Sequence, residues 1–138
     1  MVRVAAALAF CAVLSGAALA QDPAPSACAR PAAPALPERA PSGMTLAQLS
    51  TLHDQRDAYV AAADQYRLCL DRDIEQRRDA MFRTNAEMDP VLDIRAQEHS
   101  EVSAERAQVM GRFVLLCLSW EDSNRSAYPR SCYLNGGG

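Results

Sequence analysis

The sequence predicts an all-α protein: a long antiparallel two-helix hairpin with an extended, proline-rich N-terminal strap and a disulfide-tied C-terminal tail. Residues 44–88 lack glycine and proline and carry apolar side chains at three- and four-residue steps, the spacing of one helix face. A second run with apolar side chains at three- and four-residue steps spans residues 90–120. Prolines at 23, 25, 31, 34, 37 and 41 exclude a continuous helix before the first run and favour extended chain.

Residues 1–20 have the form of a secretory signal peptide. A basic start at Arg3 precedes an apolar run over residues 4–14, and Ala18-Leu19-Ala20 supplies a small-x-small cleavage site. The apolar run is too short to span a bilayer, so we expect export and no transmembrane segment. The mature protein would keep 118 of the 138 residues, enough for one small domain in the periplasm or outside the cell.

Charge argues against nucleic acid as a partner. The chain carries a formal net charge of −3 with both signs interspersed. Nucleic-acid binding needs a basic patch or stripe, which this pattern lacks.

The first helix has a clear start signal. Thr45 and Gln48 form the pattern of a capping box, and Met44 and Leu49 flank it as a hydrophobic staple would. The helix is therefore expected to begin within one residue of Thr45. The face that it is expected to bury carries Leu49, Leu52, Arg56, Tyr59, Val60, Ala63, Tyr66, Leu70 and Ile74.

A turn is expected at residues 85–90, where Asp89 can cap a second helix with Pro90 at its first position. A kink in one continuous helix is the rival interpretation. The turn is favoured because a single helix of about 70 residues would have no core to bury. The hairpin then covers residues 44–120, between a strap at 21–43 and a tail at 121–138.

The second helix carries a coiled-coil-like seam that suits lengthwise packing on the first. In a hairpin turned near residue 87, the polar stretches 75–79 and 95–101 meet in a solvated tip, and Cys69 faces about residue 105. The seam consists of Val102, Arg106, Val109, Phe113, Leu116 and Trp120.

Four cysteines remain after the signal peptide: Cys28, Cys69, Cys117 and Cys132. An even count in a small exported chain predicts two disulfides. Cys117 lies about 18 Å along the helix from the point that faces Cys69, which is beyond the roughly 7 Å that a disulfide allows. Two pairings stay open: Cys28 with Cys69 and Cys117 with Cys132, or Cys28 with Cys117 and Cys69 with Cys132. The first keeps the C-terminal link local.

The N-terminal half resembles a group of small exported bacterial proteins of unknown function. The resemblance rests on the ladder Cys28-x-x-Pro31-x-x-Pro34-x-x-Pro37 and on Tyr66-x-x-Cys69-Leu70 within a long helix, and it covers roughly residues 28–75. It implies no activity. It does imply that Cys28 pairs with Cys69, whereas Cys117 and Cys132 depart from the pattern of the group.

Few residues are candidates for metal binding or catalysis. His53 and Asp57 lie one helical turn apart, but two ligands do not make a metal site, and no Glu-x-x-His motif occurs. His99, beside Glu98 and Glu101, gives the same weak signal. No serine has a glycine-rich elbow, so we expect no catalytic residue, no cofactor and no metal.

Two apolar features concern partners. Tyr59 and Tyr66 form a stripe for which core packing is favoured, and any uncovered side of them is a possible partner surface. Residues 113–118 are apolar all round, so they need cover from the strap, the tail or a second chain in a homodimer.

We therefore expect an exported, non-enzymatic structural or protein-binding module. One alternative is a metal-handling or enzymatic periplasmic protein that uses His53, Asp57 or the acidic residues of the tip. Another is a protein that docks its apolar helix end on a membrane surface, although that helix lacks the basic polar face used on anionic lipid.

Overall fold

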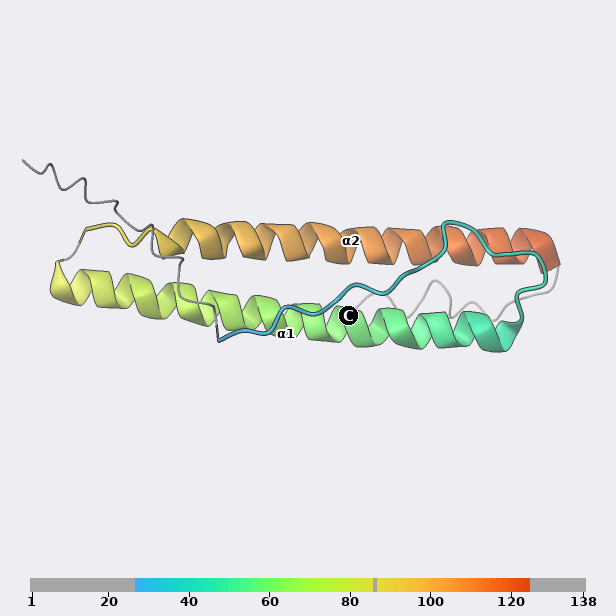
Figure 1. Cartoon of the computed structure of the whole chain (residues 1–138), viewed down its shortest axis with the longest axis horizontal. Helices are drawn as coiled ribbons and strands as arrows, with labels where there is room; N and C mark the ends of the chain where they lie inside the picture. Colours follow the sequence, from blue (N-terminus) through green and yellow to red (C-terminus); the bar gives the residue numbers. More distant parts are fainter. Residues whose placement is uncertain (1–26, 86, 125–138) are drawn as a thin grey trace, which may run out of the picture.

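The computed structural model describes residues 27–85 and 87–124, and within them the fold is all-helical, as the sequence predicts. Helix α1 spans Leu46–Thr84 and helix α2 spans Val91–Asn124. The two helices lie side by side and antiparallel as a helical hairpin (Figure 1). The predicted signal peptide and residues 125–138 of the predicted tail lie outside the described residues.

Helix α1 begins at the predicted capping box. The Gln48 amide donates to the Thr45 hydroxyl at 3.2 Å, and the Thr45 amide donates to the Gln48 side-chain oxygen at 2.8 Å. At the other end, Asn85 adopts the left-handed conformation with φ 50° and donates its amide to the carbonyl of Met81. Asparagine tolerates this conformation and ends the helix there.

Helix α2 starts as the sequence predicts and ends later. The Asp89 carboxylate accepts from the Val91 amide at 2.9 Å, which caps the helix next to Pro90. The predicted end at Trp120 is wrong by one turn, because the helix continues to Asn124. Polar side chains expected to leave the helix bond back to it: Ser123 Oγ donates to the Ser119 carbonyl at 2.9 Å, and Asn124 Nδ2 donates to the Trp120 carbonyl at 2.8 Å.

The core lies between the helices and stops well short of the turn. The Arg56 guanidinium is 4% exposed and sits 4.4 Å from the centroid of the Phe113 ring, so a cation covers part of this core. Leu70 and Val102 are the last buried apolar residues on the way to the turn. The buried apolar residues are Leu36, Leu49, Tyr59, Ala63, Tyr66, Leu70, Val102, Val109, Phe113, Leu116, Cys117 and Trp120.

Residues 27–44, the N-terminal segment, run from the middle of α1 back to its start (Figure 1). A disulfide joins Cys28 to Cys69 in α1, as the resemblance implies. Leu36 is buried in the core, and the Ala40 amide donates to Ser119 Oγ at 2.7 Å, so the segment contacts both helices. Extended chain can cross the hairpin in this way because prolines keep it from coiling.

The segment enters α1 through a tight turn. The Met44 amide donates to the Pro41 carbonyl at 3.1 Å, and Gly43 supplies the positive φ of 82° that such a turn needs. The Trp120 indole then donates to the Met44 carbonyl at 2.8 Å, which joins the start of α1 to the end of α2. This end of the hairpin is therefore closed by both apolar contacts and hydrogen bonds.

The register differs from the predicted one by about five residues. Arg95 Nε lies 3.0 Å from the Asp73 carboxylate, and Arg106 Nε lies 3.0 Å from the Asp64 carboxylate. These pairs place Cys69 opposite about residue 100, where the sequence predicts about residue 105. The seam places a side chain on the same face about once per turn. The pattern alone therefore does not fix which turns of the two helices face each other.

Candidate functional site

The tip of the hairpin, residues 71–85 and 87–101, is built differently from the rest. Among these described residues the only buried one is Arg95, at 3% exposure. The expectation of a uniformly solvated tip is therefore wrong at this position. Long arginine stems fill the space between the helices where no apolar core continues.

A chain of ion pairs holds the two arms of the tip together. Arg95 lies 3.0 Å from Asp73 on α1 and 2.9 Å from Glu98 on its own helix. Arg77 lies 3.1 Å from Asp73 and 2.9 Å from Asp89 at the start of α2. The bond from the Val91 amide, followed by that from Arg77, holds the pKa of the Asp89 carboxyl below its usual value.

Beyond this network the tip exposes two large apolar side chains. Phe82, at 84% exposure, is the most open large apolar residue that the structure describes, and Met88 follows at 77%. Both border a hollow of about 380 Å³ at the turn, whose lining residues are Arg78, Met81, Phe82, Asn85, Met88 and Leu92. An exposed aromatic ring beside a small apolar hollow is the kind of anchor that dominates binding energy in protein interfaces.

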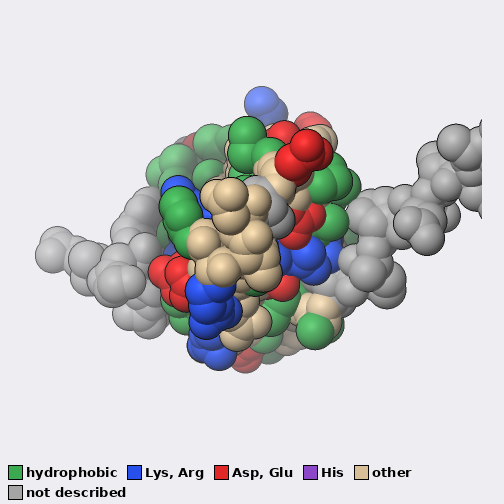
Figure 2. Space-filling model, turned by 90° about the vertical axis from the view of Figure 1, so that its left-hand side faces the viewer, with side chains coloured by type: hydrophobic (Ala, Val, Ile, Leu, Met, Phe, Trp, Pro, Cys, Tyr) green, Lys and Arg blue, Asp and Glu red, His purple; other side chains and the backbone are tan. Residues whose placement is uncertain are grey.

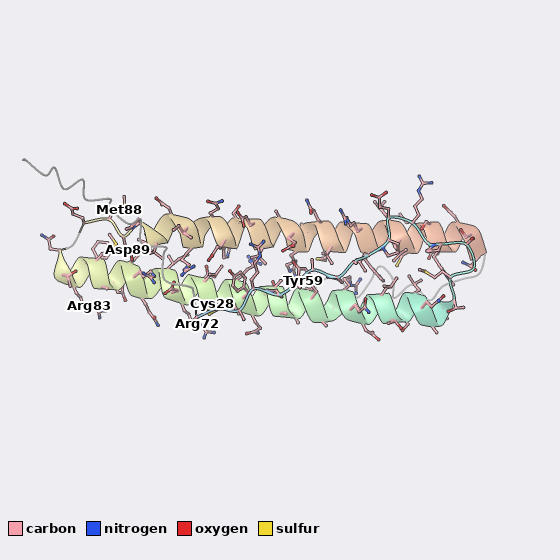
Figure 3. All side chains as sticks on the ribbon, viewed as in Figure 1. Cys28, Tyr59, Arg72, Arg83, Met88 and Asp89 are labelled. Atoms are coloured by element: carbon pink, nitrogen blue, oxygen red, sulfur yellow. A yellow bond between two sulfur atoms is a disulfide. The ribbon has the colours of Figure 1, made fainter. Side chains whose placement is uncertain are left out.

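The surroundings of this hollow carry both signs of charge. Figure 2, which looks onto the tip, shows apolar side chains interspersed with basic and acidic ones. Figure 3 places Arg83 at the end of α1 and Met88 and Asp89 at the approach to α2. The tip therefore offers a largely apolar hollow on a face where apolar, polar and charged side chains are mixed, as they are in many docking surfaces.

The tyrosines do not form the partner surface that the sequence left open. Tyr59 and Tyr66 are each 4% exposed, because α2 and the N-terminal segment cover them. Figure 3 shows Tyr59 in the space between the two helices. Burial, with a smaller contribution from the nearby Glu105 carboxylate, raises the pKa of the Tyr59 phenol to about 12. Their role is core packing.

The histidines are held in separate places. His53 Nδ1 lies 3.4 Å from Asp57 and 3.5 Å from Asp54, and its ring meets Phe113 edge-on at 5.6 Å between centroids. His99 Nε2 lies 3.5 Å from Asp71 on α1, whereas its expected neighbours Glu98 and Glu101 bond to arginines. Over residues 27–85 and 87–124, no three histidine, cysteine or acidic residues gather as a metal site would require.

The apolar end of α2 is only partly covered. Phe113, Leu116 and Cys117 are fully buried, and the sulfur of Cys117 is in a disulfide. Cys132, its predicted partner, lies outside the described residues. On the other side of the helix, Val114, Leu115 and Leu118 remain 39%, 59% and 42% exposed.

Comparisons with protein-family models, with curated proteins and with solved structures each found no match for this chain. Of the two helices that the structure describes, neither has the length and apolar character needed to cross a membrane. Sequence reasoning missed the exposed pair at the tip. The available signal was that Phe82 and Met88 fall outside both predicted seams.

Proposed function

We propose that the protein is an exported, non-enzymatic module that binds another protein through its tip. The observation that carries this proposal is the pair Phe82 and Met88, exposed beside the hollow at the turn. Two large apolar side chains held in water cost solvation free energy, and removing them from water is worth roughly 25 cal/mol per Å² of apolar surface.

The rest of the hairpin is built to hold the binding surface at the tip in a fixed position. Buried apolar residues between Leu49 and Leu70 on α1 and between Val102 and Trp120 on α2 form the core, and the Cys28–Cys69 disulfide fixes the N-terminal segment. The ion pairs of Arg77 and Arg95 then set the relative position of the two arms. A site held by rigid elements loses little conformational entropy when it binds.

Export is supported by the chemistry of the cysteines. Cys28 and Cys69 bond to each other and Cys117 is also oxidised, which is typical of proteins outside the cytoplasm. We propose Cys132 as the partner of Cys117. A non-reducing peptide map of the secreted protein should yield a peptide linking Cys117 and Cys132, and a peptide linking Cys69 and Cys132 would contradict this pairing.

The test of binding is site-specific photo-crosslinking in the cells that produce the protein. A photo-reactive residue at position 88 should give a discrete crosslinked product of higher mass. The same residue at position 68 should not, because Leu68 is 49% exposed on α1 but lies outside the lining of the hollow. Equal labelling at both positions, or none at position 88, would overturn the proposal.

Affinity measurements with the captured protein complete the test. Phe82→Ala should weaken binding about thirtyfold, since anchor residues contribute ~2 kcal/mol or more. The control is Leu68→Ala, which removes part of an apolar side chain that is 49% exposed elsewhere on α1 and should leave affinity unchanged. Phe82 is 84% exposed, so circular dichroism and melting should be the same for both variants and the wild type.

A further inference from the structure

The tip presents a projecting aromatic ring and a hollow next to each other on one small surface. The Phe82 ring projects into solvent at 84% exposure, and the hollow next to it has room for one large side chain, at about 380 Å³. Met81, Met88 and Leu92 supply the apolar walls of this hollow. Methionine side chains adapt to an aromatic ring and make favourable sulfur contacts with it.

The charges around the hollow are also of both kinds. Arg78 lies in the lining, and three further exposed residues, Asp79, Arg83 and Glu87, are each next to a lining residue in the sequence. Across the described ranges, none of these four forms an ion pair with a neighbour. A partner surface of a single sign would therefore meet like charge at some of these positions, and like-charge contacts are costly.

We infer that the occupant of the tip is a second copy of this chain, in a two-fold, tip-to-tip dimer. This inference rests on the proposed function, because it names the partner of the same surface. A two-fold contact sets one patch against itself, so a patch that holds both a projecting ring and a hollow is complementary to its own copy. Each Phe82 ring enters the hollow of the other hairpin, and arginines face carboxylates across the axis.

The geometry of such a dimer is distinctive. Helix α1 has 39 residues, which at 1.5 Å per residue is about 58 Å. A tip-to-tip dimer nearly doubles the longest dimension of the particle, whereas a side-by-side dimer leaves it almost unchanged. The contact is limited to the end of one hairpin, so we place it in the small interface class, below ~1,200 Å² in total, whose members associate weakly.

The experiment is small-angle X-ray scattering on the purified, oxidised protein over a series of concentrations. The longest dimension of the wild type should rise with concentration towards twice its value at high dilution. Phe82→Asp should stay at the monomer value throughout, because a carboxylate then faces the apolar walls of each hollow. Leu68→Asp, the matched control on α1, should behave as the wild type does.

Three outcomes would overturn the dimer: a wild type that stays monomeric, association with an unchanged longest dimension, or association of Phe82→Asp equal to that of the wild type. The photo-crosslinking described above separates this failure from failure of the proposed function. A crosslinked product between position 88 and a different protein contradicts the dimer and supports binding through the tip. A product between two copies of this chain supports both.

Discussion

Arg95 shows how a charged residue takes the place of a core at the tip. Its side chain is 3% exposed, with carboxylates of Asp73 at 3.0 Å and Glu98 at 2.9 Å. Burying a guanidinium is favourable only when it is paired and hydrogen-bonded, and these two acids, one from each helix, accept hydrogen bonds from its Nε and Nη1. The sequence shows that the residues of the tip are mostly polar, but it does not show which of them are buried.

Arg95→Ala should lower the free energy of unfolding by about 1–3 kcal/mol, because it removes bonds to charged partners and leaves a gap. Urea unfolding measures this. Arg72→Ala is the matched control, since Arg72 is exposed and forms no ion pair within the described residues, so its effect should stay within about 0.5 kcal/mol. Equal losses in the two variants would mean that the network does not stabilise the tip.

The Asp89 carboxylate makes the stability of the start of α2 depend on pH. Its pKa is lowered mainly by the Val91 amide and then by Arg77, both of which favour the charged carboxylate. A carboxyl with a lower pKa in the folded chain adds stability above its unfolded pKa of about 3.9, and this stability disappears as pH falls through the folded value. The stability gap between wild type and Asp89→Asn should therefore be present at neutral pH and close in acid.

Urea unfolding of both proteins at several pH values tests this. Asp79→Asn is the control, because Asp79 is exposed and has no ion pair in the described part of α1. It should show no gap that depends on pH in this way. A gap for Asp89→Asn that stays constant into strong acid would show that the carboxylate charge does not stabilise the turn.

At the scale of the element, the N-terminal segment is held by a few specific contacts. It has no helix or strand of its own, and its anchors are the Cys28–Cys69 disulfide, the ion pairs of Arg30 with Glu101 and Glu105, and the buried Leu36. Arg30 is also the main reason that the pKa of Glu101 lies below its usual value. The disulfide is the strongest of these anchors, because exposed ion pairs contribute little.

Replacing Cys28 and Cys69 together by serine should lower the free energy of unfolding by about 3–4 kcal/mol. The estimate follows from the loop entropy of a crosslink between residues 41 apart in sequence. The segment should also open locally, which would speed hydrogen exchange at the Leu36 amide, bonded at 3.0 Å to the Pro34 carbonyl.

The control for this variant places serine at exposed sites on the same two elements, as Ala29→Ser with Ala62→Ser. This pair should change neither the free energy of unfolding nor the exchange at Leu36. Unchanged stability after loss of both cysteines would mean that noncovalent contacts alone hold the segment.

At the scale of the whole molecule, the hairpin has an apolar half and an ionic half. Buried apolar side chains stop at Leu70 and Val102, and the described arms beyond them are joined by Arg77 and Arg95. Local stability follows buried apolar contacts, so the tip should open more readily than the rest.

Hydrogen exchange measured by mass spectrometry tests this division. Amides in residues 75–84 and 91–98 should exchange faster than those in residues 49–70 and 102–120. Comparable protection along both helices would show that the ion pairs stabilise the tip as well as the apolar core stabilises the other half.

The sequence by itself determined the features that depend on neighbouring residues. The capping box at Thr45 and the cap at Asp89 each involve groups within three positions of one another. Interactions between such near neighbours follow directly from the local sequence, so the helix starts were predicted closely. The Cys28–Cys69 bond was anticipated through a resemblance rather than through spacing.

Only the tertiary structure decided the register, the burial of Arg95, the enclosure of Tyr59 and Tyr66, and the exposure of Phe82 beside its hollow. Each depends on many weak contacts between residues far apart in the chain. The seams repeat every turn, so a shift by one turn preserves the pattern while changing which side chains meet. The register decides which residues are buried. No short stretch of the sequence specifies the register.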